Sequence, residues 1–191
     1  MLEELKEKVC AANKELLRRR LVSWQIGNVS GRDKDREYVV IKPEGVDFED
    51  LTTADMVVTD LNGEVVEGKH EPCGYIFAHC YVYKKRADIF GITHTHSTYA
   101  SSYALQGQSI RAKLIPQTGN LGGDIPVTKK YDASDKNGIG RALVAAMKTG
   151  KEKAVILRKH GIFAFGGSAM DSVKNAVLLE DLAKTYRVAG R

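Results

Sequence analysis

The tripeptide Leu61-Asn62-Gly63 constrains the fold of this chain more than any other local pattern. It joins two runs rich in β-branched residues, Met56–Asp60 and Glu64–Glu67. An Asn-Gly pair between two such runs is a strong short-range signal for a β-hairpin, because both residues tolerate tight turns. The pattern therefore predicts antiparallel strand pairing at this point of the chain.

Strand-like and helix-like patterns alternate along the rest of the sequence. Helices are expected where apolar residues recur at spacings of three and four, and strands where short apolar runs end at turn residues. The expected helices are Leu2–Leu16, Tyr75–Lys85, Thr98–Leu105, Gly138–Lys148 and a last one from Ser168 nearly to the end. The expected strands or extended segments are Gly27–Gly31, Tyr38–Ile41, Ile89–Thr93, Arg111–Ile115, Ile125–Thr128, Ala154–Leu157 and Ile162–Phe165. This order predicts one α/β domain over residues 1–191, with a mixed, largely antiparallel central sheet and helices on its faces.

Composition narrows the classes of partner. The 191 residues suit one well-cored domain, and no apolar stretch approaches the length of a membrane span. A formal charge of +5 is spread along the chain, so neither a nucleic-acid nor a membrane partner is predicted. The three cysteines are an odd number at no finger-like spacing, and the first residues lack the layout of a signal peptide. These features predict a cytoplasmic protein with free thiols.

The tripeptide His94-Thr95-His96 carries the clearest chemical signal. It ends the expected strand Ile89–Thr93, and side chains two residues apart on a strand point to the same face. Two imidazoles side by side on rigid backbone are a usual start of a site for zinc or another transition metal. Two histidines that only hydrogen-bond at a strand end are the alternative interpretation.

A third candidate ligand, His160, lies far away in sequence between two expected strands. Gly161 follows it, and a glycine lets two backbone segments approach closely. Three histidines leave open positions on a metal, which suits polarisation of a substrate carbonyl. His70 lies in a charged stretch and His79 on an expected helix, so both are weaker candidates, and His79 is expected to be a packed structural residue.

Several motifs occur in a recognisable order over essentially the whole chain. They are Gly27-Asn28-Val29-Ser30, Ile41-Lys42-Pro43-Glu44-Gly45-Val46, Asp55–Val58, Gly63–Gly68, His94–Ser97, Gly107–Ile110, Ile125-Pro126 and His160–Gly166. In this order the motifs resemble the class II aldolase/adducin family, and within it most closely the L-ribulose-5-phosphate 4-epimerases.

The resemblance implies a fold, a reaction and a set of residues. It places zinc, or another divalent transition metal, on His94, His96 and His160. It implies that a small phosphorylated sugar is bound by Asn28, Lys42 and the backbone of Gly45. The implied reaction is retro-aldol cleavage of a ketose phosphate through a metal-bound enediolate. An aldolase releases the aldehyde fragment, whereas an epimerase turns and rejoins it. The resemblance further implies a homotetramer with the site near a subunit boundary.

The chain departs from the family pattern at the residues around this metal. Glu44 stands where the family has a serine, and a carboxylate beside a phosphate dianion is electrostatically unfavourable. Cys73 and Gly74 stand at two serine positions of the phosphate site, and Tyr75 replaces the acidic residue near the metal. A second catalytic aspartate of the epimerases aligns with Gly119, and Asp124 is the nearest carboxylate.

These departures leave three functions open. The first is a metal-dependent epimerase or lyase in which Glu44, Cys73 and Gly74 contact the substrate and Tyr75 serves as the catalytic proton donor. The second is an aldolase of the L-fuculose-phosphate type. The third is a metal-binding but inactive, repurposed or engineered scaffold of the same fold. The three histidines favour catalysis, because a scaffold role does not need them.

Overall fold

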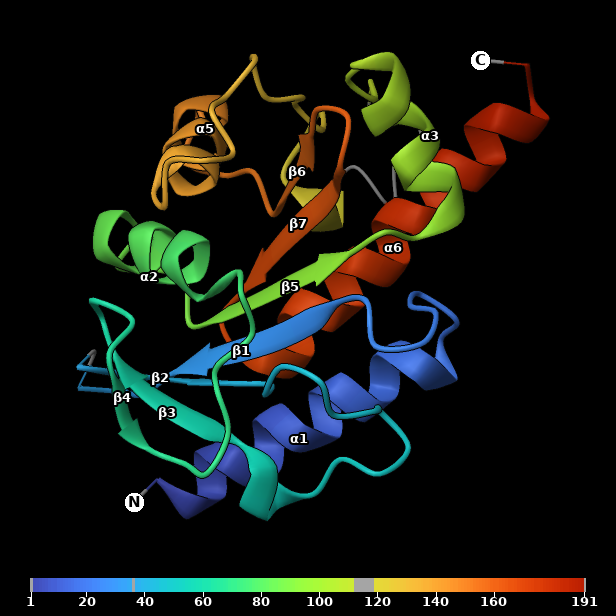
Figure 1. Cartoon of the computed structure of the whole chain (residues 1–191). Helices are drawn as coiled ribbons and strands as arrows, with labels where there is room; N and C mark the ends of the chain where they lie inside the picture. The colour runs from blue at the N-terminus through green and yellow to red at the C-terminus, as the bar shows by residue number, and fades with distance from the viewer. Residues whose placement is uncertain (1, 36, 112–118, 191) are drawn as a thin grey trace.

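A single antiparallel sheet forms the centre of the computed structural model, which describes residues 2–35, 37–111 and 119–190 (Figure 1). Its strands lie in the order β4-β3-β2-β1-β5-β7-β6. Their bounds are β1 Asn28–Arg32, β2 Tyr38–Ile41, β3 Val57–Asp60, β4 Val65–Glu67, β5 Gly91–Thr95, β6 Ala154–Leu157 and β7 Gly161–Gly166. All neighbouring pairs of these strands are antiparallel.

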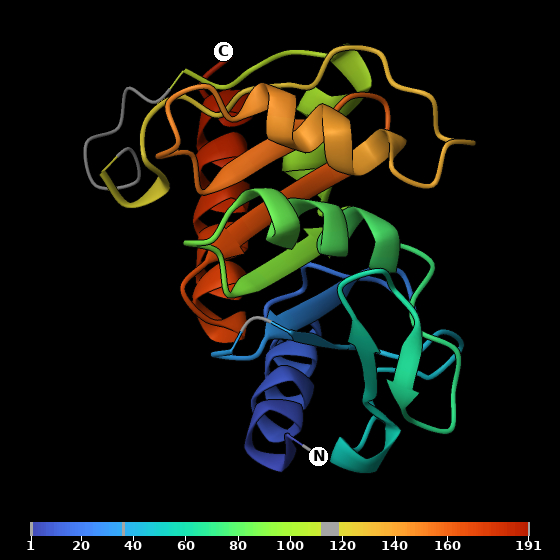
Figure 2. The same ribbon diagram turned by 90° about the vertical axis from the view of Figure 1, so that its left-hand side faces the viewer.

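Helices cover both faces of the sheet (Figures 1 and 2). Helices α1, α3 and α6 pack on one face, where the larger apolar core lies, and α2 and α5 pack on the other. Their bounds are α1 Glu3–Arg18, α2 Ile76–Lys85, α3 Thr98–Gln106, α5 Gly138–Ala146 and α6 Ala169–Val188, with a short 3₁₀ helix at Thr53–Asp55. The expected α/β architecture, with a largely antiparallel sheet between helices, is therefore confirmed.

The hairpin predicted at Asn62-Gly63 joins β3 to β4. Gly63 takes the left-handed backbone conformation, with φ +86°, which favours glycine. The Asp60 carboxylate accepts the Asn62 backbone N–H at 2.7 Å, and the Asp60 N–H donates to the Glu64 carbonyl at 2.9 Å. Hydrogen bonds within and beside the predicted Asn62-Gly63 turn therefore close the hairpin.

Two expected elements differ in the structure, and a third cannot be compared. The helix expected over Gly138–Lys148 ends at Ala146, because the Met147 backbone leaves the helical region at ψ 78°. The segment Ile125–Thr128 forms isolated bridges in place of a strand, and the bridge from Val127 to Ile156 is parallel. Most of the expected extended segment Arg111–Ile115 lies outside the described residues.

Strand β5 is an interior strand of the sheet and lies between β1 and β7. In the register, Asn28 on β1 and Phe163 on β7 both stand opposite His94 on β5. Because β7 runs antiparallel to β5, the turn that precedes β7 lies at the same end of the sheet as His94. Among the described residues, no helix has both the length and the apolar character needed to cross a membrane.

Candidate metal centre

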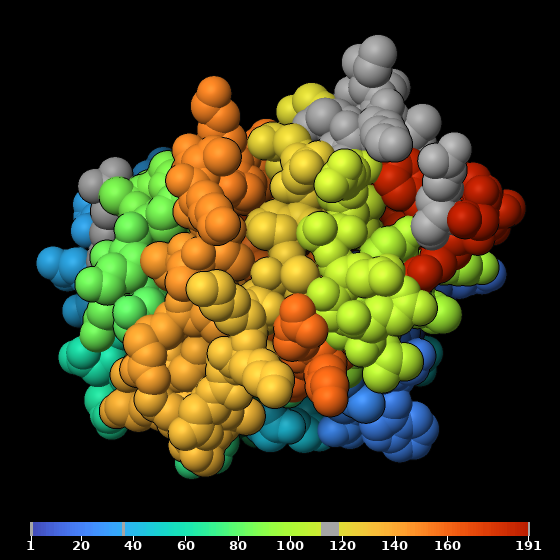
Figure 3. All heavy atoms as spheres, turned by 90° about the horizontal axis from the view of Figure 1, so that it is seen from above, coloured from blue at the N-terminus to red at the C-terminus, as the bar shows by residue number. Residues whose placement is uncertain are grey.

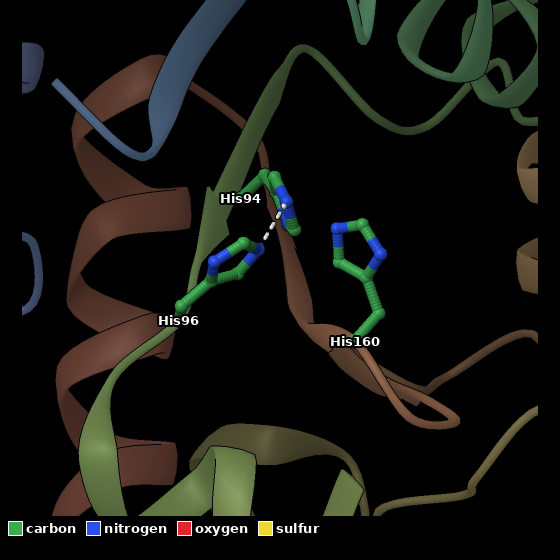
Figure 4. Close-up of side chains that lie close together, drawn as sticks. All are labelled: His94, His96 and His160. Carbon is green, nitrogen blue, oxygen red and sulfur yellow. Dashed lines mark hydrogen bonds between the residues drawn. The ribbon is translucent and has the colours of Figure 1, made fainter. Parts of the chain in front are cut away.

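Three histidines meet at the carboxyl end of β5 (Figure 4). His94 lies on β5, His96 follows just after the strand, and His160 comes from the turn between β6 and β7. One ring nitrogen of each lies within 4.8 Å of the others, and the Nε2 atoms of His94 and His96 are 3.1 Å apart. The sequence predicted that these three histidines form one site, and the structure brings their side chains together.

The β6–β7 turn approaches β5 closely because Gly161 has no side chain. A Cβ at this position would lie 2.5 Å from the Thr95 carbonyl oxygen and 2.5 Å from Cδ2 of His96. Real Cβ atoms do not come so close, so glycine is required here. The neighbouring Lys159 adopts φ +58°, which completes the tight turn. In the surface view this turn is exposed, in orange-red, between α3 and the segment that precedes α5 (Figure 3).

His94 is held in one orientation and one tautomer. Its ring is fully buried and stacks on Phe163 at a centroid distance of 4.3 Å. Its Nδ1 lies 2.8 Å from the Ile162 carbonyl oxygen, which can only accept, so Nδ1 carries the proton. Nε2 consequently keeps its lone pair and faces His96. Such a backbone partner for the second ring nitrogen is typical of metal-bound histidines.

The electrostatic setting keeps the three imidazoles neutral. Burial lowers the pKa of His94 well below its usual value, and burial also lowers the pKa of His96. Burial, and then the neighbouring His96, lower the pKa of His160. Neutral imidazole is the form that binds metal. Nitrogens bound to a tetrahedral zinc ion lie about 3.3 Å apart, so the 3.1 Å separation of the two Nε2 atoms fits a divalent metal of this class.

Tyr75 lies beside this group of histidines. Its hydroxyl is 2.8 Å from Nε2 of His160, and its ring centroid is 4.5 Å from that of His94. Burial raises the pKa of the Tyr75 phenol, so the hydroxyl is protonated at neutral pH and donates this hydrogen bond. A metal bound through the same nitrogen would replace the hydrogen bond. Tyr75 is therefore positioned to exchange a proton next to the ligand set.

Next to the histidines, two loops and the first residue of β1 form a second polar group, which we call the loop cluster: Asn28, Lys42, Glu44, Cys73 and Gly74. The Asn28 side-chain amide donates to Sγ of Cys73 at 3.1 Å, and the Gly74 N–H donates to Oε2 of Glu44 at 3.1 Å. The Lys42 ammonium is buried and lies 5.0 Å from the centre of the Phe48 ring. Burial lowers the pKa of Lys42, and the nearby Cys73 and Glu44 oppose this effect.

The remaining candidates lie apart from the three histidines. His70 contacts the Asp55 carboxylate at 3.1 Å. His79 is fully buried, as expected of a structural residue, and the three-histidine group includes neither it nor Asp124. Gly45 follows Glu44 with φ +72°, and a Cβ added at Gly119 would meet no atom of the described residues within 4 Å.

Sequence reasoning missed Phe163 and Ser30, whose contacts support the histidines. Phe163 forms the ring surface on which His94 stacks, and Ser30 bonds to Nδ1 of buried His79 at 2.7 Å. The continuous apolar run Ile162–Phe165 marks a buried strand, but only the strand register places Phe163 opposite His94.

A family model for the class II aldolase and adducin N-terminal domain matches residues 7–187. The chain belongs to this family. The solved structure of an L-fuculose 1-phosphate aldolase matches with 28% sequence identity and a TM-score of 0.86, over 98% of this chain and 86% of that chain.

Two further solved members share the fold at lower identity. The L-fuculose 1-phosphate aldolase from Glaciozyma antarctica has 23% identity and a TM-score of 0.80, over 98% of this chain and 74% of that one. The L-fuculose-1-phosphate aldolase from Thermus thermophilus has 21% identity and a TM-score of 0.81, over 100% of this chain and 97% of that one. The family assignment of the sequence is thus confirmed, while its particular closeness to the epimerases stays a prediction.

Proposed function

We propose that this chain is a metal-dependent enzyme that breaks and forms a carbon–carbon bond of a small ketose by retro-aldol chemistry. The observation that carries this proposal is the group of His94, His96 and His160, whose ligand nitrogens lie within 4.8 Å of one another. A tautomer set by the Ile162 carbonyl supports it, because that contact leaves the inward nitrogen of His94 ready for a metal.

The metal held by the three histidines would be Zn²⁺ or another divalent transition ion. When bound, it supplies a Lewis acid that stabilises negative charge developing on a ketose oxygen. Three histidine ligands leave positions open for substrate. His94 cannot turn away, because Phe163 and the Ile162 carbonyl hold its ring.

Tyr75 is the proposed proton donor. In the bond-forming direction the Tyr75 hydroxyl gives its proton to the aldehyde oxygen of the incoming fragment and becomes tyrosinate. In the cleavage direction the tyrosinate form takes that proton back from the substrate hydroxyl. Its hydrogen bond to His160 at 2.8 Å supports this role, because the hydroxyl lies next to a metal ligand. The loop cluster, with Gly45 beside it, would bind the end of the substrate.

Aldolase and epimerase share the cleavage step and differ in whether the aldehyde leaves. The sequence motifs favour an L-ribulose-5-phosphate 4-epimerase, whereas the solved relative at 28% identity is an L-fuculose 1-phosphate aldolase. The fixed tautomer of His94 supports metal binding, which all three alternatives share, and the Tyr75 hydroxyl beside His160 favours either enzyme over an inactive scaffold.

The predicted homotetramer and cytoplasmic location stay predictions. One feature supports a subunit boundary near the site: Trp24 and Ile26 are 79% and 54% exposed, just before Asn28 on β1. Large apolar side chains at this exposure are typical of contact surfaces.

Two measurements test the proposed function. Protein purified without added metal is expected to hold about one divalent ion per chain, and His94→Ala is expected to lose it. The loaded enzyme is then incubated separately with L-fuculose, L-fuculose 1-phosphate, L-ribulose and L-ribulose 5-phosphate, while aldehyde and epimer are followed. Wild-type protein without stoichiometric metal, or loaded enzyme without turnover of any of the four sugars, would refute the proposal.

A further inference from the structure

Backbone hydrogen bonds hold the two loops of the loop cluster together. The Glu44 N–H donates to the Glu71 carbonyl at 2.9 Å, and the Cys73 N–H donates to the Lys42 carbonyl at 3.1 Å. Asn28 stands opposite His94 in the strand register, and Tyr75 directly follows Gly74. The loop cluster is therefore a rigid wall beside the candidate metal centre.

The hydrogen-bond donors of this wall already have acceptors within the protein. The Gly74 N–H is taken by the Glu44 carboxylate, the Asn28 amide N–H by Cys73, and the Lys42 ammonium donates to the Pro43 carbonyl at 3.1 Å. A phosphate dianion needs several such donors at once. The second N–H of the Asn28 amide and the remaining N–H bonds of Lys42 are left for a phosphate, but the Glu44 carboxylate lies at the Gly74 backbone N–H and would repel it.

Among the acceptors of the wall, the amide oxygen of Asn28 is unsatisfied within the described part of the chain. Oδ1 of Asn28 belongs to a side chain with 0% exposure, and it has no hydrogen-bond partner in the described part of the chain. A buried amide oxygen without a partner is unfavourable, and a ligand that donates to it removes the penalty. Glu44 is exposed and adds a charged acceptor. A hydroxyl group donates to such acceptors and accepts from an ammonium at the same time.

We infer that the loop cluster binds a neutral, hydroxyl-bearing end of the ketose and discriminates against a phosphorylated end, with Glu44 as the residue that sets this specificity. The inference rests on the proposed retro-aldol function and concerns only whether the end of the substrate carries a hydroxyl group or a phosphate. The charges of Lys42 and Glu44 explain why a neutral end is preferred over a phosphorylated end. Lys42 and Glu44 nearly cancel, whereas a phosphate monoester carries about −1.5 to −2 charges at neutral pH and would face the Glu44 carboxylate.

A pair of achiral probes tests this specificity. Dihydroxyacetone and dihydroxyacetone phosphate differ only in the terminal group, so their binding to the metal-loaded protein can be compared by calorimetry at about pH 7.5, where the ester is mostly a dianion. Wild-type protein is expected to bind dihydroxyacetone more tightly. Glu44→Gln and Glu44→Ser are expected to tighten binding of the phosphate ester about tenfold or more, because the opposing charge is removed.

The matched control is Glu71→Gln, which removes one negative charge from the neighbouring exposed loop. It is expected to change the affinity for the phosphate ester less than about twofold, because exposed charges at a distance are screened. Titration with inorganic phosphate adds a readout that needs neither turnover nor a carbonyl, so it separates this inference from the proposed reaction. The inference is overturned if wild-type protein binds the ester more tightly than dihydroxyacetone or fails to bind dihydroxyacetone. It is equally overturned if both Glu44 variants leave phosphate affinity unchanged.

Discussion

Replacing His79 with phenylalanine is expected to make the protein less sensitive to acid. His79 lies on α2 with 0% exposure, packed against the sheet that carries the candidate metal centre. Its Nδ1 bonds to Ser30 Oγ at 2.7 Å, while its Nε2 has no partner among the described residues. Burial lowers the pKa of His79 to about 3, because a charged imidazole here would have no water around it.

The size of the effect follows from the two pKa values of His79. The unfolded chain takes up a proton near the ordinary histidine pKa of 6.5, whereas the folded protein takes it up only near a pKa of about 3. Between these values the unfolded state binds more protons, so the free energy of unfolding falls as the pH falls. The loss is about 1.4 kcal/mol per pH unit, or about 2 kcal/mol at about pH 5. Well above pH 6.5 His79 is neutral in both the folded and the unfolded state, so this loss of stability is absent.

Urea unfolding of wild type and His79→Phe at about pH 7.5 and about pH 5 measures this difference. Ser30 keeps its second partner, the Tyr83 hydroxyl at 2.8 Å, so the phenylalanine leaves no unpaired serine. Contributions of other titrating groups are common to both proteins and cancel when the two pH-dependent losses are subtracted. Wild type is expected to lose about 2 kcal/mol more than the variant on going to the lower pH.

Equal losses in the two proteins would show that the folded state accepts a proton at His79 without penalty, and the reasoning from burial would be wrong. His79→Leu provides a second measurement, since its side chain cannot titrate either. It is expected to show the same reduced acid sensitivity, although its smaller volume lowers stability at both pH values.

Three further results are expected. Tyr75→Phe should lower kcat about 10²-fold or more while metal content stays at the wild-type level, and a normal kcat would exclude Tyr75 as proton donor. Chelation of the metal should lower the melting temperature by roughly 5–10 °C if the ion is present at about 100 times its Kd, and the His94→Ala protein should show no such shift. Gly91→Ala should cost about 3 kcal/mol or more in the free energy of unfolding, because its Cβ would lie 2.0 Å from the Ser168 carbonyl oxygen. Gly119→Ala is the control, because a Cβ there meets no described atom within 4 Å, and equal stability of these two variants in urea would contradict the steric argument.

Much of the fold could be predicted because its signals are local. The amphipathic pattern of α1, the Asn62-Gly63 turn and the cap at Ser168 each act within a few residues, and all appear in the structure. The segment Ile125–Thr128 shows the limit. Its apolar residues look extended in sequence, but it makes only isolated bridges, because its partners Ile110 and Ile156 lie in two different parts of the fold.

In the candidate site, too, some features follow from local sequence and others only from contacts between distant segments. His94 lies on β5 and His96 follows two residues later, just after the strand ends, so the two-residue period of extended backbone already predicts that their side chains are neighbours. His160 joins them only because β7 pairs with β5, a contact between segments far apart in the chain. The sequence suggested Glu44 as a substrate contact, but its hydrogen bond to the Gly74 N–H depends on how two loops meet.

The sequence by itself determined most of the elements, the family and the identity of the three candidate metal ligands, because each is written in residue type and short-range spacing. The tertiary structure alone decided which nitrogen of His94 faces inward, that the Tyr75 hydroxyl reaches His160, and that the oxygen of buried Asn28 is left open among the described residues. These last features arise from contacts between distant strands and loops, and no local pattern encodes a hydrogen bond whose partners are brought together only by the packed fold.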